Sequence, residues 1–308
     1  MPILHANLET DLRLAQALDQ ALLVSLTDMA SIRNVPGAVD FHGSVTGTGS
    51  DTSRLRYVAL GGADHFAATA AEDTDVAESA LAVSSVDIAV TRAALVRNIG
   101  DLATATGFGD DVDPEGLAAD MVASYDGYFN SLFTTAGATA TSNVGSTGVD
   151  MSHSDFMDAI YTLEIASVPG PWICVLHPRQ LADWQESLRA EGGATQFMAA
   201  TAEMMAIKGQ GYAGNHSGVD IFKMSDVVQT GGDREGFMYG AGTFGYKVAI
   251  IDDRAMFGAG SSLVVRADEI LVEVTRDASR AITEIVGNAW VGLSVKEDAR
   301  LVGIVTDA

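Results

Sequence analysis

The spacing of hydrophobic residues predicts two long helices in the first half of the chain. Over residues 7–30, apolar side chains recur at three- and four-residue steps, which is typical of an amphipathic helix. A second stripe runs from Leu117 to Phe133 at four-residue steps, after an Asp-Pro-Glu helix start. It predicts a helix over residues 114–136, roughly 34 Å long at about 1.5 Å per residue, which Gly137 ends.

Strand-like patterns fill the span between these two helices, residues 39–92. Residues 41–48 and 54–60 alternate or are rich in β-branched side chains, and residues 80–89 are a third strand candidate. The segment 61–79 consists of small and acidic residues, which cannot build a core of their own. We expect the whole span to form a long β-ribbon that projects from a body. Because a two-stranded ribbon is marginally stable alone, a partner is expected to support it.

The second half of the chain begins as an α/β pattern, near residues 150–255, and ends as an all-β pattern. Ser152 opens a helix in the α/β part, and a proline-led helix follows a buried strand. The predicted elements are a loop at 138–150, a helix from 152 that ends before 169, a strand at 172–176, a helix from 178, a helix at 195–207, a loop at 209–218, and strands at 219–224, 236–239, 246–251, 270–275, 285–295 and 301–305.

Composition narrows the class of protein. The 308 residues include 18 Lys and Arg against 41 Asp and Glu, a net charge of −23, which excludes a nucleic-acid-binding protein built on clustered cations. A hydrophobic content of 47% excludes disorder, and the one cysteine, Cys174, excludes a disulfide framework or a thiolate metal cluster. No uncharged apolar run approaches the ~18 residues of a membrane helix. Asp11 and Asp19 fall where a signal peptide would be apolar, so we expect a soluble protein.

Two glycine motifs match the dinucleotide-binding spacing G-x-G-x-x-G, at residues 209–214 and 240–245. That fingerprint needs a strand before the glycines and a helix after them, so that the helix N-terminus faces the pyrophosphate. The first match follows a predicted helix, and the second leads into a predicted strand. We therefore interpret both as turns or loops and predict no cofactor.

Acidic and histidine residues give no recognisable catalytic or metal site. Residues 111–116 resemble the start of a calcium loop, but Val122 stands where a bidentate Glu is required. The acidic segment 64–78 is interpreted as a solvated loop, with weak cation binding as the alternative. His153-Ser154-Asp155 holds triad residue types, but a triad converges from separate segments, so a helix cap is the better interpretation. The lack of a recognisable catalytic or metal-binding motif in the sequence favours a structural role.

The order of the predicted parts resembles the major capsid protein of tailed viruses (bacteriophages or archaeal viruses), which has the Hong Kong 97 fold. Residues 128–137 are similar to the end of the spine helix in that family. Residues 172–181 are similar to its axial strand, which turns through a proline into a helix. Residues 276–280 and 286–292 resemble its returning strands. The resemblance covers essentially the whole chain.

This resemblance implies an α+β fold with five named parts. They are an N-terminal arm (residues 1–38), an extended β-hairpin called the E-loop (39–92), a peripheral domain with the long spine helix (93–149), an axial α/β domain (150–255), and C-terminal strands that return to the peripheral domain (256–308).

The implied function is structural, with no enzymatic activity. Copies of the chain would assemble in the host cytoplasm into hexamers and pentamers, forming the icosahedral virion shell around double-stranded DNA without sequence-specific binding to it or to a membrane. Further implied partners are a portal, a scaffolding protein or protease, and a cement protein. All four lysines lie at or after Lys208, so the E-loop lysine that some relatives use for a covalent crosslink is missing, and no such crosslink is expected.

Nine residues are candidate subunit contacts on the basis of the resemblance. They lie on the arm, the ribbon and the loop expected at the tip of the axial domain. They are Leu12, Arg54, Arg56, Tyr57, Asp73, Asp75, Gly209, Tyr212 and Gly214.

Alternatives of other kinds remain. An encapsulin, a cellular compartment with the same fold, is the nearest; a nucleotide-binding oxidoreductase and an extracellular β-rich adhesin fit less well.

Abundant Asp and scarce Lys suggest a halophilic or marine host, whereas a GC-rich mesophilic host would explain the Arg excess but not the acid excess. Residues 1–150 hold 6 basic and 20 acidic side chains, so shell assembly is expected to depend on salt.

Deleting residues 61–79 tests the ribbon assignment. The body is expected to stay folded, because the segment has too few apolar side chains to contribute to a core, while assembly is expected to fail. Circular dichroism melting reads the fold and electron microscopy reads the shells. Normal shells from the deleted chain would show that the ribbon assignment is wrong.

Overall fold

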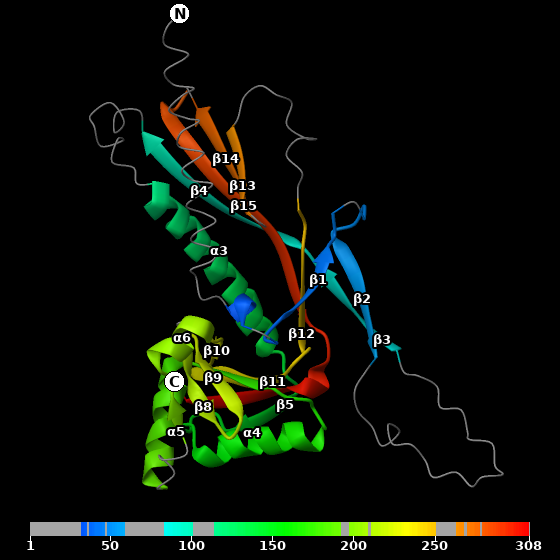
Figure 1. The fold of residues 1–308 in the computed structure, drawn as a ribbon, viewed down its shortest axis with the longest axis vertical. Coiled ribbons are helices and arrows are strands. Elements are labelled where there is room, and N and C mark those ends of the chain that lie inside the picture. The colour runs from blue at the N-terminus through cyan, green and yellow to red at the C-terminus, as the bar shows by residue number, and fades with distance from the viewer. Residues whose placement is uncertain are drawn as a thin grey trace, which may run out of the picture.

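The computed structural model describes residues 32–35, 37–46, 48–58, 83–100, 114–191, 197–208, 211–250, 263–267, 270–277 and 279–307. Within them, one sheet runs alongside a long helix, a second sheet lies at the C-terminal end of that helix, and a separate two-stranded ribbon extends from the side (Figure 1). The predicted helix at 7–30 and the ribbon segment 61–79 lie outside the described residues.

Four helices are described. They are α3 (Pro114–Gly137), α4 (His153–Ile165), α5 (Pro178–Ala190) and α6 (Ala202–Lys208). Short 3-10 turns also occur at Ile32–Asn34 and Asp298–Arg300. Among the helices that the structure describes, none combines the length and apolarity needed to cross a membrane.

The six-stranded sheet is organised around one strand, β15 (Ile282–Val295). One edge of β15 pairs with β14 (Ile270–Asp277), which pairs in turn with β13 (Leu263–Ala267). Strand β15 also pairs with β4 (Thr91–Gly100) over residues 282–291 and with β12 (Phe244–Val248) over residues 291–295. Helix α3 packs along this sheet, where Met121, Tyr125 and Phe129 are buried with Ile285 and Ala289.

The eight-stranded sheet forms the body. Its strand order is β5 (Ser142–Gly145), β16 (Leu301–Asp307), β11 (Asp233–Gly240), β6 (Trp172–Leu176), β9 (Val219–Lys223), β8 (Tyr212–His216) and β7 (Met198–Ala199), with β10 (Gln229–Thr230) paired to β11. On one face of this sheet, α4 and α5 bury Phe156, Leu163 and Trp184 against Cys174 and Ile304.

An aromatic cluster joins the long helix to both sheets. The ring of Phe133, near the end of α3, is fully buried. Its centroid lies 5.2 Å from that of Phe237 in β11 and 4.8 Å from that of Phe244 in β12. Gly137 has no room for a Cβ atom because the Phe237 ring occupies that position. The glycine predicted as a helix stop therefore also permits the close approach of α3 to the body.

Buried polar side chains fix the start of α5. His177 caps the helix by accepting a hydrogen bond from the Arg179 amide, 3.2 Å away. Gln180 is fully buried, and its side-chain oxygen accepts from the His177 amide at 3.0 Å. The Gln180 amide group donates to the Thr306 hydroxyl at 2.8 Å, which ties α5 to β16. A buried polar group paired in this way carries little desolvation cost.

Most of the long elements agree with the sequence predictions. The predicted helices starting at 114, 152 and 178 correspond to α3, α4 and α5. The cap interpretation of His153-Ser154-Asp155 is also confirmed, because Ser152 and Asp155 form a capping box.

Several short elements differ from the prediction. Residues 138–150, expected as a loop, contain β5; residues 195–207, expected as a helix, contain β7 before α6; and the loop expected at 209–218 contains β8. These strands are short and rich in small or polar residues, so their stability comes from neighbouring strands rather than from their own pattern.

Two strands lie in other sheets than expected. Strand β1 (Asp40–Ser44) pairs with β12 in the six-stranded sheet and not with the ribbon. Strand β16 pairs with β11 and β5 in the body, although the C-terminal strands were expected to return to the other domain. Strand β4 was not predicted.

Replacing Phe133 with alanine is expected to lower the free energy of unfolding by about 3–5 kcal/mol, because the ring is fully buried where three elements meet. The matched control is Phe41→Ala, since Phe41 is 52% exposed and the same change should cost about 1 kcal/mol or less. Urea unfolding followed by fluorescence measures both. Equal losses in the two variants would contradict the central role of Phe133.

Candidate subunit-contact surfaces

The ribbon consists of β2 (Thr52–Val58) and β3 (Val83–Ala89), paired antiparallel. It leaves the side of the molecule beside β1 (Figure 1). Among the described residues, β2 and β3 pair only with each other, so both outer edges are unpaired. Val58 and Val83 face each other across the ribbon and are 46% and 60% exposed. An unpaired ribbon with exposed apolar residues is suited to contact with another chain.

The base of the ribbon is held firmly by the six-stranded sheet. Ile88 is only 1% exposed, and the amide of Val90 donates to the carbonyl of Asp51 at 2.8 Å. The ammonium group of Lys247 on β12 donates to the Ser53 hydroxyl at 2.6 Å. Gly292 of β15 has no room for a Cβ atom because the Ala89 backbone lies against it. The ribbon is therefore anchored at one end.

Charged residues lie on the outer face of the ribbon. Arg54 and Asp87 form an ion pair at 2.9 Å, with side chains 62% and 50% exposed. The hydrogen bond from Arg54 holds the pKa of Asp87 below its ordinary value, although so exposed a pair adds little to stability. Arg56 lies opposite Ser85 and has no ion-pair partner among the described residues. Tyr57 lies on the other, half-buried face.

In the eight-stranded sheet, the Asp220 carboxylate on β9 accepts hydrogen bonds from three donors. It accepts from the Lys208 ammonium group at 2.5 Å, from the Asn215 amide at 3.0 Å and from the Tyr212 hydroxyl at 3.3 Å. The Lys208 nitrogen also lies 4.9 Å from the centre of the Tyr212 ring. Burial, the charge of Asp220 and this hydrogen bond raise the pKa of Tyr212 to about 12.

Of the three contact residues predicted in the 209–218 segment, Tyr212 and Gly214 are buried rather than exposed. Tyr212 is 2% exposed, so only a small part of it reaches the surface. Gly214 is buried in β8 at φ +150°, and a Cβ atom there would meet the Met198 carbonyl and the Phe197 ring. Gly209 lies outside the described residues, as do Leu12, Asp73 and Asp75.

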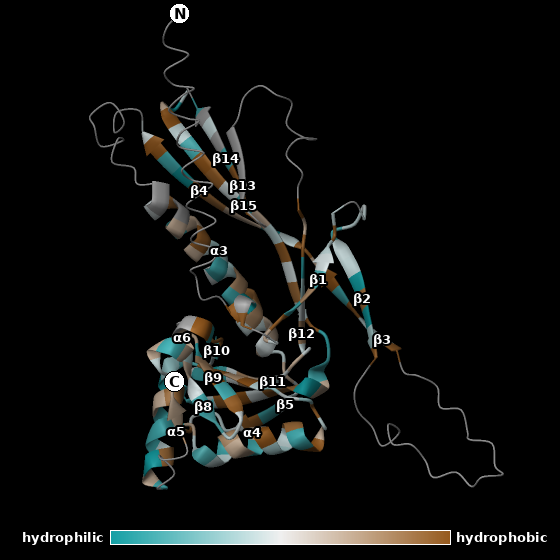
Figure 2. Ribbon diagram, in the orientation of Figure 1, coloured by the Kyte–Doolittle hydropathy of each residue, from teal (hydrophilic) through white to brown (hydrophobic). Residues whose placement is uncertain are grey.

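An exposed apolar stripe lies on α4 and was not noticed in the sequence. Met157, Tyr161 and Ile165 are 39%, 61% and 66% exposed and follow one another at four-residue steps. The hydropathy colouring in Figure 2 shows apolar residues among the hydrophilic ones along this helix. The sequence does contain the signal for this stripe, because residues spaced four apart share a helix face. The same helix also carries a buried apolar stripe that includes Phe156, Ile160 and Leu163, and the two stripes overlap in the sequence pattern.

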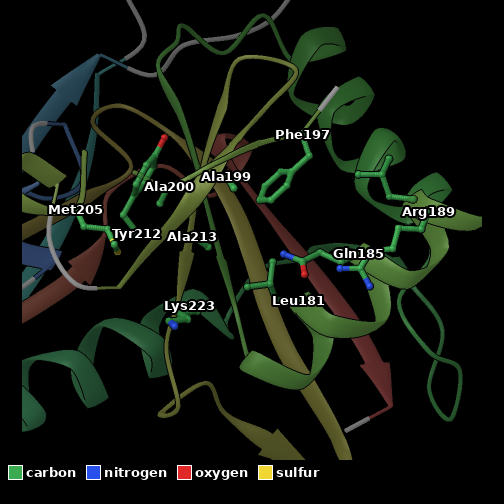
Figure 3. A pocket seen from close by; sticks show the side chains of 11 residues that line it. Leu181, Gln185, Arg189, Phe197, Ala199, Ala200, Met205, Tyr212, Ala213 and Lys223 are labelled. Atoms are coloured by element: carbon green, nitrogen blue, oxygen red, sulfur yellow. The ribbon is translucent and has the colours of Figure 1, made fainter. Parts of the chain in front are cut away.

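A cavity of about 670 Å³ opens between α5, β7 and β8 (Figure 3). Leu181, Leu188, Phe197 and Met205 supply most of its apolar wall. Arg189 and Lys223 also line it, and no carboxylate does so among the described residues.

The metal, thiol and glycine-motif candidates can be placed within the described residues. They contain no group of three or more His, Cys, Asp and Glu side chains that could hold a metal ion. Cys174 is fully buried in β6, and burial raises the pKa of its thiol. The glycine motif at 240–245 forms the turn between β11 and β12, and a strand rather than a helix follows it.

Solved structures with a similar fold are capsid shells. The chain matches the capsid of Ralstonia phage GP4 with a TM-score of 0.61, 11% identity, and coverage of 91% of this chain and 92% of that one. It matches the capsid of a native GTA particle with a TM-score of 0.60, 12% identity, and coverage of 91% and 90%. The chain has the fold of a capsid shell protein. The predicted α+β class is thereby confirmed. At such low sequence identity, these matches establish the fold alone.

An encapsulin also shares this fold. The encapsulin complex from Synechococcus elongatus matches with a TM-score of 0.58, 10% identity, and coverage of 89% of this chain and 88% of that one. No protein-family model matches the sequence, and no curated protein does so either.

Asp220→Asn is expected to lower the pKa of Tyr212 from about 12 towards 10.0, without reaching it, because burial is the larger cause. Since the folded-state pKa is raised, the neutral hydroxyl contributes stability below pH about 10 that is lost as the pH rises through about 12. Phenolate absorbance, as the difference from a Tyr212→Phe variant, measures the titration. The exposed Asp226→Asn is the control, and an unchanged Tyr212 pKa in Asp220→Asn would contradict this assignment.

Proposed function

We propose that the chain is the major capsid protein of a tailed virus, which assembles into hexamers and pentamers that form an icosahedral shell around double-stranded DNA. The observation that carries this proposal is the match to the Ralstonia phage capsid over nearly the full length of both chains. The anchored, unpaired ribbon supports it, because such an element gains its remaining contacts from a neighbouring copy.

In this proposal the parts of the molecule take the roles that a capsid subunit needs. The ribbon of β2 and β3 is the E-loop, α3 is the spine helix of the peripheral domain, and the eight-stranded body is the axial domain. Residues 1–38 form the arm. Strands β13, β14 and β15 belong to the peripheral domain, whereas β16 belongs to the axial domain, since it pairs there.

The contact residues follow from these roles. Arg54, Arg56 and Tyr57 contact a neighbouring copy from the ribbon, and Arg56 is the freest charge because it lacks an intramolecular ion pair among the described residues. Leu12, Asp73, Asp75 and Gly209 are proposed contacts on the sequence argument alone. Tyr212 and Gly214 act from within, by holding the shape of the tip.

The shell is held by non-covalent contacts, since no lysine precedes Lys208. A portal, a scaffolding protein or protease, and a cement protein are the proposed partners, and assembly takes place in the host cytoplasm. A net charge of −23 keeps the subunit from binding the enclosed DNA tightly. The acid excess is also compatible with a halophilic host.

An encapsulin-type compartment is the second candidate, because the Synechococcus encapsulin complex matches over 89% of the chain. Electron microscopy of native particles separates the two functions. DNA-filled particles with one tail vertex support the virus capsid, whereas smaller shells that hold protein cargo support the compartment.

Assembly of the purified protein tests the proposal. The wild-type chain is expected to form hexamers, pentamers or shells, with the assembled fraction dependent on salt because charged surfaces meet. Light scattering and negative-stain images across a salt series measure it. A strictly monomeric protein under every condition would overturn the proposal.

Arg56→Glu is expected to lower the assembled fraction at least about tenfold, because it reverses a free charge on the ribbon that meets an acidic neighbour. The melting temperature should not change, since Arg56 has no ion pair to lose among the described residues. Arg179→Glu on α5 is the control; it loses the ion pair with Asp183, so its own melting temperature is measured as well. Equal assembly by both variants would remove Arg56 from the contact.

A further inference from the structure

The stripe on α4 forms an apolar ridge with acidic borders. Met157, Tyr161 and Ile165 project from one side of the helix and are exposed. Asp158 and Glu164 are exposed beside them. The sequence of α4 contains three carboxylates and no Lys or Arg. Large apolar side chains arranged along one exposed helix face are typical of a surface that another protein covers.

The cavity beside α5 has the opposite character. Figure 3 shows Arg189 and Gln185 on one side of it, with Met205 and Tyr212 on the other. Arg189 and Lys223 have no ion-pair partners among the described residues, which is unusual in a chain with 41 acidic residues. The cavity therefore offers an apolar recess with two unneutralised cations at its margin.

We propose that the α4 ridge of one copy inserts into the α5 cavity of the next copy. The proposal rests on the self-assembly proposed above and names the contact that closes a ring. An apolar ridge flanked by acids matches an apolar recess bordered by cations, in both hydropathy and charge. The helices that carry them, α4 and α5, pack side by side against the same sheet. Ridge and cavity therefore belong to one rigid body, so they can meet only between copies.

Such a contact is heterologous, because two different surfaces of the subunit meet. Repeating a heterologous contact by a fixed rotation produces a closed ring when the rotation divides a full turn. The occupant of the cavity is thus a second copy of this chain, and each copy gives one ridge and receives another. The ribbon remains free for a different set of neighbours.

Site-specific disulfide trapping tests the contact directly. Tyr161→Cys places a thiol on the ridge, and Ala199→Cys places one at the cavity, where Ala199 is exposed on β7. The native Cys174 is fully buried and should not react. After the two singly substituted proteins are mixed at an assembling salt concentration, molecular oxygen with a copper catalyst oxidises the two thiols to a disulfide.

A covalent dimer of one chain of each kind is the expected product, at a yield at least about tenfold above that of the control mixture. The control replaces the ridge variant by Val96→Cys, since Val96 is 49% exposed on β4 of the other sheet. A yield no higher than the control, from chains that assemble normally, would overturn the ridge-and-cavity contact and leave the proposed function standing. A wild-type chain that never assembles would overturn both.

A charge exchange provides the second test. Glu164→Arg and Arg189→Glu are each expected to lower the assembled fraction about tenfold, because each places like charges together. The double variant should recover most of the wild-type assembly, while all three keep the wild-type melting temperature. Loss in both single variants without recovery in the double variant would contradict the pairing of these two surfaces.

Discussion

The packing of Phe133 is the contact on which the rest of the structure depends. Its ring lies between Phe237 of the body and Phe244 of the six-stranded sheet, at the end of the one helix that spans both. Because Gly137 has no side chain, the Phe237 ring of β11 packs directly against the backbone of α3. A close-packed junction of this kind has few alternative arrangements. It fixes the body relative to the sheet that anchors the ribbon, so the surfaces proposed for assembly are held at set positions on one rigid subunit.

Charge is distributed unevenly over that subunit. The chain is strongly acidic, yet Arg56 on the ribbon and Arg189 and Lys223 at the cavity lack ion-pair partners among the described residues. Unpaired cations on an acidic protein attract the acidic surfaces of other copies and leave the interior of the subunit unaffected. Neighbour recognition would then act through these few positions, while the overall negative charge discourages tight binding to DNA.

The sequence predicted the long elements and the class of the fold because their signals are local. Helix α3 follows from one stripe with a four-residue step, α4 and α5 follow from their caps, and β6 follows from its run of apolar residues. Strand β8 was missed although Ser217-Gly218, both at positive φ, form the two-residue turn that joins it to β9. That dipeptide is a hairpin signal. Strands β5 and β7 are short and carry no comparable signal. Strand β5 pairs with β16, which is distant in sequence, and β7 pairs with β8 on the far side of α6 in the chain.

The candidate contact surfaces were likewise predictable from the sequence only in part. By itself, the sequence determined the composition, the periodic helices, the exposed ribbon residues Arg54 and Arg56, and the lack of any recognised catalytic pattern. Only the tertiary structure decided that Tyr212 is buried against Asp220, that β16 belongs to the body, and that the α4 ridge and the α5 cavity lie on one domain. Periodicity is a property of neighbouring residues, whereas burial, strand partners and cavities arise from residues brought together from distant parts of the chain, which no local pattern records.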